Sequence, residues 1–230
     1  MLVRLMASFT LLAKFFGLAF SALLPVINPL GSALMFLGIV GPADGAVYRS
    51  LARKIAISTT LFLAIVELVG TALLAFFGIS LPVVQVAGGL VLAAMGWGLL
   101  NQQSASDDSA RTAAAATTDS GSLEQQVFYP LTFPITAGPG CIVVTLTLSA
   151  HASAKTVLPD VMAHVGIVLA IVALSVSVFL CYGYAPRITE RISSQTAHGI
   201  LRVIAFVLLC IGVQITWNGV EALLKIVMHS

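Results

Sequence analysis

The most constraining feature of this sequence is a set of six long stretches that are almost free of charge. A helix rises about 1.5 Å per residue, so about 20 mainly apolar residues cross the hydrocarbon of a bilayer. The stretches are residues 15–40, 55–81, 82–100, 127–150, 161–186 and 203–220. Glu67 is the one Asp, Glu, Lys or Arg inside them. The sequence therefore predicts an all-α integral membrane protein with six transmembrane helices, multi-pass and in contact with the lipid bilayer.

Composition supports this class and excludes two others. Of the 230 residues, 59% are hydrophobic and 9% are charged, whereas about 25% of the residues of an average soluble domain are charged. So few charges cannot coat a soluble globule, and so many apolar residues do not remain disordered. We therefore expect neither a soluble enzyme nor a disordered chain.

The sequence shows no pattern for catalysis, a metal, a cofactor or nucleic acid. The net charge is +2, and no run of basic residues suggests nucleic acid as a partner. Three isolated cysteines lack metal-ligand spacing, and the four histidines lie at span ends or in loops: Cys141, Cys181, Cys210, His151, His164, His198 and His229. We predict a protein that is not an enzyme, with no catalytic residues, no metal site and no cofactor.

A polar segment divides the chain into two groups of three spans. Residues 101–126 contain five charged residues and many Ser, Ala, Thr and Gln residues, which is typical of a flexible linker. The first unit is residues 1–100 and the second is residues 127–230. Because each unit crosses an odd number of times, the second must enter the membrane from the opposite face. We expect two inverted repeats.

The two units also resemble each other in sequence. Residues 63–68 correspond to residues 169–174, and residues 91–96 correspond to residues 207–212. In the first span of each unit, Pro25 followed by Asn-Pro-Leu-Gly corresponds to Pro134 followed by Gly-Pro-Gly, 109 residues later. Inverted repeats of this kind recur in secondary transporters. The alternative is a duplication that only builds a stable bundle.

Lysine and arginine near the span ends predict the orientation. The loops after the first, third and fifth spans carry Arg49, Arg53, Lys54, Arg111, Arg187, Arg191 and Arg202. The other side carries Arg4, Lys14, Lys155 and Lys225. This distribution places the odd-numbered loops in the cytoplasm and both termini outside.

Proline and glycine cluster near the middle of the first and fourth spans. Proline lacks an amide donor and disrupts the preceding helical turn, so both helices should be broken there. Hydrocarbon cannot hydrate the freed backbone groups, which must face protein, ligand or water. The candidate substrate-binding residues are Asn28, Pro29, Gly31, Thr132, Thr136, Gly138, Pro139 and Gly140. The alternative is a pair of kinks used for packing, with each threonine bonded to its own helix.

Glu67 is the second candidate, because an ionised carboxyl inside a span costs several kcal/mol. It should therefore be protonated or paired. Small and polar residues at three- and four-residue spacing accompany it on one helix face, which should turn it into the bundle. Glu67 is the proton-coupling candidate, and a neutral Glu hydrogen-bonded to a neighbouring helix is the alternative.

Several of these segments together resemble the MarC family of six-helix bacterial and archaeal membrane proteins. They are residues 28–31 (Asn-Pro-Leu-Gly), residues 77–82 (Phe-Gly-Ile-Ser-Leu-Pro), residues 87–89 (Ala-Gly-Gly), Pro130 with Leu131, Pro134, residues 137–140 (Ala-Gly-Pro-Gly), residues 212–214 and residues 218–219. The resemblance covers essentially the whole chain. It implies a bacterial or archaeal plasma (inner) membrane protein, and some members are classed as transporters of small neutral amino acids. It supports the residues of the two Pro/Gly motifs more than Glu67.

These observations lead to one hypothesis and two rivals. The first is a secondary transporter of small neutral amino acids or similar solutes, working by alternating access with proton coupling at Glu67. The second is a non-transporting membrane assembly or envelope-stress component, linked to multiple antibiotic resistance only by the family's name. The third is a channel. The sequence leaves the substrate, the coupling ion and the oligomeric state open, a homo-oligomer included.

Overall fold

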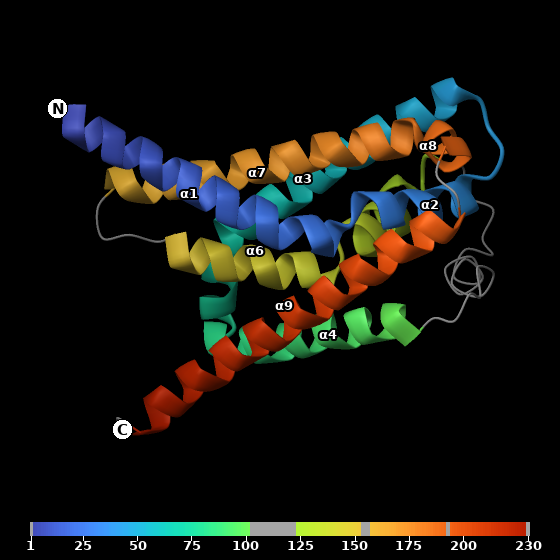
Figure 1. Cartoon of the computed structure of the whole chain (residues 1–230). Helices are drawn as coiled ribbons and strands as arrows, with labels where there is room; N and C mark the ends of the chain where they lie inside the picture. Colours follow the sequence, from blue (N-terminus) through green and yellow to red (C-terminus); the bar gives the residue numbers. More distant parts are fainter. Residues whose placement is uncertain (1, 102–122, 153–156, 192–193, 229–230) are drawn as a thin grey trace.

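The protein folds into a bundle of long apolar helices. The structure, a computed structural model, describes residues 2–101, 123–152, 157–191 and 194–228, and these contain helices and no strand. The helices are α1 (Leu2–Ile27), α2 (Pro29–Val40), α3 (Gly45–Phe76), α4 (Leu81–Asn101), η1 (Val127–Thr136), α6 (Pro139–Ala152), α7 (Val157–Gly183), α8 (Ala185–Arg191) and α9 (Ser194–Met228). Both termini lie at the same end of the bundle, on the left of Figure 1.

The described helices fit the six predicted crossings. Five stretches are long and apolar enough to span a membrane, with α1 and α2 counted together from Ser8 to Val40. The sixth is η1 with α6, a pair bent by 66°. The six-helix membrane class is therefore confirmed. Most of the predicted linker, residues 102–122, lies outside the described residues, so its flexibility stays a prediction.

Several helix boundaries differ from the predicted ones. The second span starts ten residues before the predicted position, at Gly45, and ends at Phe76, because Arg49, Arg53 and Lys54 continue the helix beyond the apolar stretch. The last helix, α9, extends well past the predicted residues 203–220 at both ends. The tight turn between the second and third spans is present: Gly78 has φ 68°, and the amide of Ile79 donates to the carbonyl of Leu74. Glycine adopts this left-handed conformation without strain. Beyond this turn α3 and α4 diverge, and both pack on α6.

Glycines allow α4 and α9 to pack with their backbones in close contact. A Cβ added to Gly96 would lie 2.6 Å from the amide nitrogen of Leu209, and one added to Gly212 would lie 2.3 Å from that of Ala93. Such close approach is how membrane helices gain van der Waals contact, since lipid removes the hydrophobic drive between them. α4 therefore depends on α9, its main partner in the bundle (Figure 1).

The packing pairs each helix of the first unit with a helix of the second. α4 packs on α9 and α3 on α7, while α1 packs on α7 and α6 packs on α3. Exchanging the two units leaves the α4–α9 and α3–α7 contacts unchanged and converts the α1–α7 contact into the α6–α3 contact. An inverted relation between the units would produce this pattern, and the inverted relation itself stays a prediction.

The end of the bundle that carries the basic residues can be assigned a side of the membrane by experiment. In a chain without its native cysteines, we expect Val157→Cys, at the start of α7, to react with a membrane-impermeant maleimide in intact spheroplasts. Ser50→Cys, near the start of α3, should react only after the membrane is permeabilised, because Arg49, Arg53 and Lys54 favour the cytoplasmic side. Both positions are exposed. The reverse labelling pattern would contradict the predicted orientation.

Candidate functional site

The first break is a single residue, Asn28, between α1 and α2. Asn28 has φ 44° and ψ 65°, the left-handed conformation that asparagine tolerates better than most side chains. Its side-chain Oδ1 accepts a hydrogen bond from the amide of Gly31 at 3.1 Å, and Pro29 starts α2. The predicted break is therefore present as a local change of backbone, within a stretch that still forms one span.

The second break is longer, because two prolines follow each other at four-residue spacing. Tyr129 and Phe133 have extended backbone angles, near φ −120° and ψ 123°. Each precedes a proline through a cis peptide bond, Tyr129-Pro130 and Phe133-Pro134. Because prolines disfavour the helical conformation of the preceding residue, η1 lacks a regular helical ladder before α6 begins at Pro139.

Hydroxyl groups bond backbone carbonyls at both breaks. The hydroxyl of Thr132 donates to the carbonyl of Val127 at 2.8 Å, and that of Thr136 donates to the carbonyl of Leu131 at 2.6 Å. In the first break, Ser32 donates to the carbonyl of Ile27 at 2.8 Å. Each donor lies five residues after its acceptor. The threonines thus bond their own segment, as the packing alternative predicted, and they satisfy carbonyls that hydrocarbon could not.

One of these contacts repeats between the two units. The thiol of Cys141 lies 3.9 Å from the carbonyl of Thr136, again five residues apart. Cys141 and Thr136 are each 109 residues after Ser32 and Ile27, the offset that also relates Pro25 to Pro134. The two breaks therefore share a local contact as well as a sequence pattern.

The breaks meet each other inside the bundle. The hydroxyl of Ser32 lies 3.4 Å from the carbonyl of Ile135, and the hydroxyls of Thr136 and Tyr182 are 2.8 Å apart. The ring of Tyr182, from α7, stacks on Phe36 of α2 with centroids 4.7 Å apart. Ser32, Thr136 and Tyr182 are all buried. We call these three residues the junction cluster.

The other predicted binding residues surround this cluster without forming an open site. Gly31 packs against Asn28 and Leu201, and Gly140 packs against Leu92 and Val26. Gly138 is buried and Pro139 is exposed. These contacts leave little space at the two breaks. Whether the predicted residues bind a solute stays a prediction.

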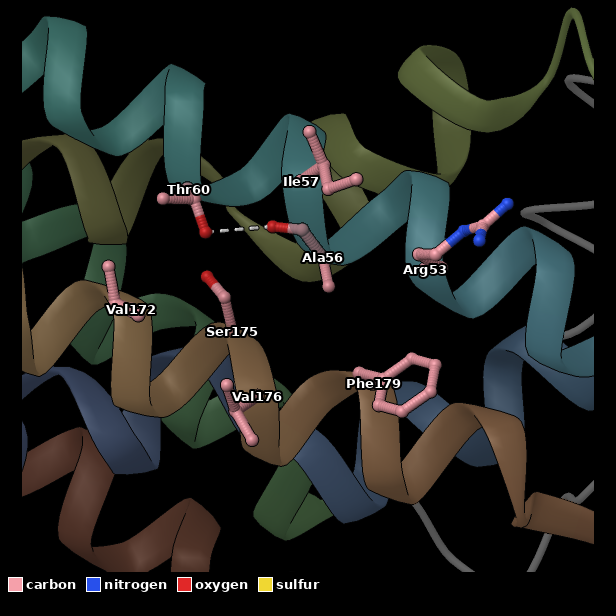
Figure 2. Close-up of a pocket in the computed structure, with 8 residues that line it drawn as sticks. All are labelled: Arg53, Ala56, Ile57, Thr60, Val172, Ser175, Val176 and Phe179. Atoms are coloured by element: carbon pink, nitrogen blue, oxygen red, sulfur yellow. Dashed lines mark hydrogen bonds between the residues drawn. The ribbon is translucent and has the colours of Figure 1, made fainter.

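A groove lies between α3 and α7, away from the two breaks. It has a volume of about 310 Å³ and is lined by Arg53, Ala56, Ile57, Thr60, Val172, Ser175, Val176 and Phe179. The hydroxyls of Thr60 and Ser175 face each other across it, and Arg53 lies at one end (Figure 2). None of the residues of the two breaks lines it. In this conformation the breaks are in contact with each other and not with this groove.

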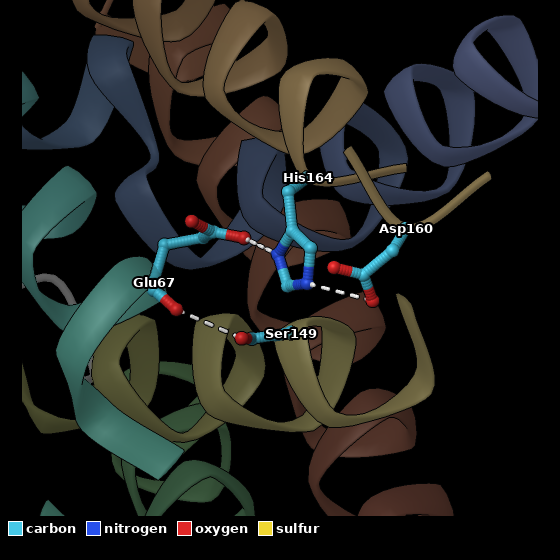
Figure 3. A network of polar contacts seen from close by, with 4 residues as sticks. All are labelled: Glu67, Ser149, Asp160 and His164. Carbon is cyan, nitrogen blue, oxygen red and sulfur yellow. Dashed lines mark hydrogen bonds and ion pairs between the residues drawn. The ribbon is translucent and has the colours of Figure 1, made fainter. Parts of the chain in front are cut away.

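Glu67 is buried, as its position among small residues predicted, and its side chain is 0% exposed. One carboxylate oxygen, Oε1, bonds Nδ1 of His164 on α7, and the hydroxyl of Ser149 on α6 donates to the Glu67 backbone carbonyl at 2.8 Å. The other ring nitrogen of His164, Nε2, lies 3.8 Å from Asp160. Figure 3 shows this chain of contacts. Glu67 is therefore paired, and it lies in the last third of α3.

Sequence reasoning missed several residues of these arrangements, among them His164, Ser32 and Tyr182. His164 was grouped with histidines at span ends, but α7 starts at Val157, so His164 lies about two helical turns inside. Ser32 directly follows the Asn-Pro-Leu-Gly motif, and its equivalence to Cys141 at the 109-residue offset was available as a signal. Tyr182 had no signal, because only the fold brings α7 to the breaks.

Comparison with known proteins identifies the family. A family model described as MarC family integral membrane protein matches residues 13–224. The chain belongs to the MarC family. This confirms the family expected from the sequence motifs.

Similar MarC proteins come from several bacteria. The UPF0056 inner membrane protein MarC of Salmonella typhimurium is 28% identical over 216 residues, covering 93% of this chain and 97% of the relative. The proteins of that name from Escherichia coli O157:H7 and Citrobacter koseri are 28% and 29% identical over 219 residues, with the same coverage. No solved structure matches the chain significantly. The names of these MarC relatives give an inner-membrane location, in agreement with the predicted one, and no substrate.

Proposed function

We propose that this chain is a secondary transporter of small neutral amino acids or similar solutes, working by alternating access between its two three-helix units. The observation that supports this most is the meeting of two broken spans, one from each unit, at the buried junction cluster. Paired broken helices at a repeat interface are the common location of solute sites in secondary transporters.

Under this proposal, the structure corresponds to a closed conformation. Separating the two units would part Ser32 from Ile135 and Phe36 from Tyr182, two contacts that join the units. A zwitterion has an ammonium group that donates hydrogen bonds and a carboxylate that accepts them. The carbonyls and hydroxyls at the breaks match the first, and the amides at the start of α2 and α6 match the second.

The packing at the breaks also favours a small, uncharged solute. The residues that contact one another there, Ser32, Ile135, Thr136 and Tyr182, carry no charge at neutral pH. Gly31 and Gly140 are already in close contact with side chains of neighbouring helices. A modest separation of the two units would therefore admit only a small molecule. A solute with a net charge would find no oppositely charged side chain among these residues.

A non-transporting membrane assembly is the second candidate, because it predicts a closely packed interior at the breaks. The described contacts between the breaks match that prediction as well. It also predicts a stable protein partner and no solute movement. The two candidates therefore differ in a measurement of uptake.

The test is uptake of radiolabelled glycine and L-alanine by proteoliposomes that contain the full chain. We expect saturable uptake and exchange, and at least a tenfold loss in Thr136→Val, because this change removes the hydroxyl that joins Leu131 to Tyr182. Thr145→Val is the matched control: Thr145 is also buried on the same span, and its hydroxyl has no partner among the described residues. Absence of saturable uptake and exchange in the wild type, for either amino acid and with or without a pH gradient, would overturn the proposal. Ion flux without saturation would indicate a channel.

A further inference from the structure

Three titratable residues form a line from an exposed end of α7 into the bundle. The exposed fraction of the side chain is 36% for Asp160, 21% for His164 and 0% for Glu67. One imidazole ring lies between the two carboxylates: Nε2 faces Asp160 at 3.8 Å, and Nδ1 bonds Glu67 (Figure 3). The side chains thus become more buried along the series of contacts, from Asp160 through His164 to Glu67.

This geometry does not suit a metal ion. The two nitrogens of an imidazole point in different directions, and here each faces its own carboxylate. The three groups therefore do not converge on a common point. Within the described ranges, no group of three His, Cys, Asp or Glu residues is placed to hold a metal. The arrangement instead has the geometry that proton transfer through a histidine ring requires.

Other titratable groups on the neighbouring helices face elsewhere. α3 packs against α6, α7 and η1. On α6, His151 is exposed and its Nδ1 bonds the carbonyl of Thr147 on its own helix. On η1, Tyr129 is exposed, and on α7, Tyr182 bonds Thr136 in the junction cluster. Among the described residues, His164 is thus the titratable group in contact with the Glu67 carboxyl.

The Glu67 carboxyl itself is incompletely paired. Its second oxygen, Oε2, is buried and has no hydrogen-bond partner among the described residues. A buried carboxylate with one unpaired oxygen is costly when ionised, and binding a proton removes that charge. The carboxyl therefore has a physical reason to accept a proton from the ring beside it.

We infer that Asp160 and His164 form the path by which a proton reaches Glu67 from the membrane face where α7 begins. A proton binds Nε2 and makes the ring an imidazolium, which the nearby Asp160 carboxylate stabilises. The Nδ1 proton then passes to Oε1 of Glu67. The products are a neutral carboxylic acid and a neutral ring that holds its proton on Nε2.

This inference rests on the proposed function for its purpose, which is to couple transport to a proton gradient. In the predicted orientation, α7 begins on the outer side of the membrane. The proton would therefore enter from outside, the direction in which a bacterial proton gradient runs. A relay on the opposite side would need the reverse orientation, which the cysteine labelling above detects.

Infrared difference spectroscopy of the full chain in nanodiscs tests the proton site without requiring transport. As pH rises, we expect the wild type to lose the C=O band of a protonated carboxyl, and Glu67→Gln should lack that change. His164→Gln should move its midpoint by at least one pH unit, whereas His151→Gln should leave it unchanged. The inference is overturned if the wild type has no such band, or if His164→Gln titrates as the wild type does.

Transport provides the second measurement. Asp160 is partly exposed at the start of α7, and Asp160→Asn keeps the size of its side chain. In proteoliposomes of known orientation, His164→Gln should lose at least tenfold in uptake driven by a pH gradient and retain exchange. Asp160→Asn should slow gradient-driven uptake more at high outside pH, where protons are scarce. Equal gradient-driven uptake in wild type, Asp160→Asn and His164→Gln would refute the relay. If the wild type neither takes up nor exchanges solute, the transporter proposal fails, and the infrared titration still decides the proton site.

Discussion

Gly96→Leu is expected to prevent accumulation of the folded protein, the largest stability effect that we predict. A Cβ at residue 96 would lie 2.6 Å from the amide of Leu209 and 2.9 Å from the carbonyl of Ala205. These are backbone atoms of α9, so the two helices would have to separate. Overpacking by smaller groups already costs about 1–3 kcal/mol, so Gly96→Ala should lower the thermal midpoint and leucine should exceed what the bundle tolerates.

Gly98→Leu is the matched control, two residues further along α4. A Cβ on Gly98 meets nothing within 4 Å, so a larger side chain there would extend into lipid. Size-exclusion chromatography of the detergent-solubilised variants, followed by thermal unfolding, measures the difference. Equal yields and equal midpoints for the residue 96 and residue 98 variants would show that α4 and α9 do not pack as described.

Glu67→Gln is expected to reduce pH-driven uptake at least tenfold while amino acid exchange continues. Glutamine keeps the size and a hydrogen-bonding oxygen for His164, but it cannot carry a proton. Exchange moves solute in both directions without net proton movement, so it should survive. Initial rates in proteoliposomes, with an imposed pH gradient and with preloaded unlabelled solute, separate these two modes.

Two outcomes distinguish coupling from structure in this variant. Loss of both modes with a lowered thermal midpoint would assign Glu67 a structural role as a neutral partner of α7. Unchanged pH-driven uptake would remove the proton role altogether. Gln85→Leu is a useful comparison, since Gln85 is a second buried polar residue of a spanning helix and no step assigns it a proton.

Much of the fold followed from local chemistry that a sequence displays. Charge-free length predicted the six spans, and Gly78 before Pro82 predicted the turn between α3 and α4. The helix ends were harder to predict, because α3 and α9 continue beyond the apolar stretch through charged and polar residues, which water can hydrate at the membrane interface. An apolar stretch therefore marks the part of a helix in the membrane and not its full length.

The candidate site, like the fold, was predicted only in part from the sequence. Prolines and Asn28 predicted where the backbone would break, since their effect is local. The partners of the freed carbonyls were not predictable, because they depend on side-chain rotamers. These carbonyls accept hydrogen bonds from the hydroxyls of Thr132, Thr136 and Ser32 and do not face a cavity. Tyr182 and His164 reached Thr136 and Glu67 across long sequence separations, 46 and 97 residues. Such contacts follow from the packing of α7 and leave no pattern within one segment.

Cross-linking of the two breaks tests most directly whether they move apart during transport. In a chain without native cysteines, Ser32→Cys and Ile135→Cys would be joined by a short bis-methanethiosulfonate, whose disulfide links a reductant cleaves, because the Ser32 hydroxyl lies 3.4 Å from the Ile135 backbone carbonyl. We predict that glycine exchange by the double variant in proteoliposomes stops on cross-linking and returns on reduction, while neither reagent changes the exchange rate of a single cysteine variant from that variant's own starting value. Full exchange by the cross-linked protein would contradict the account, since the breaks would then carry out their function without separating.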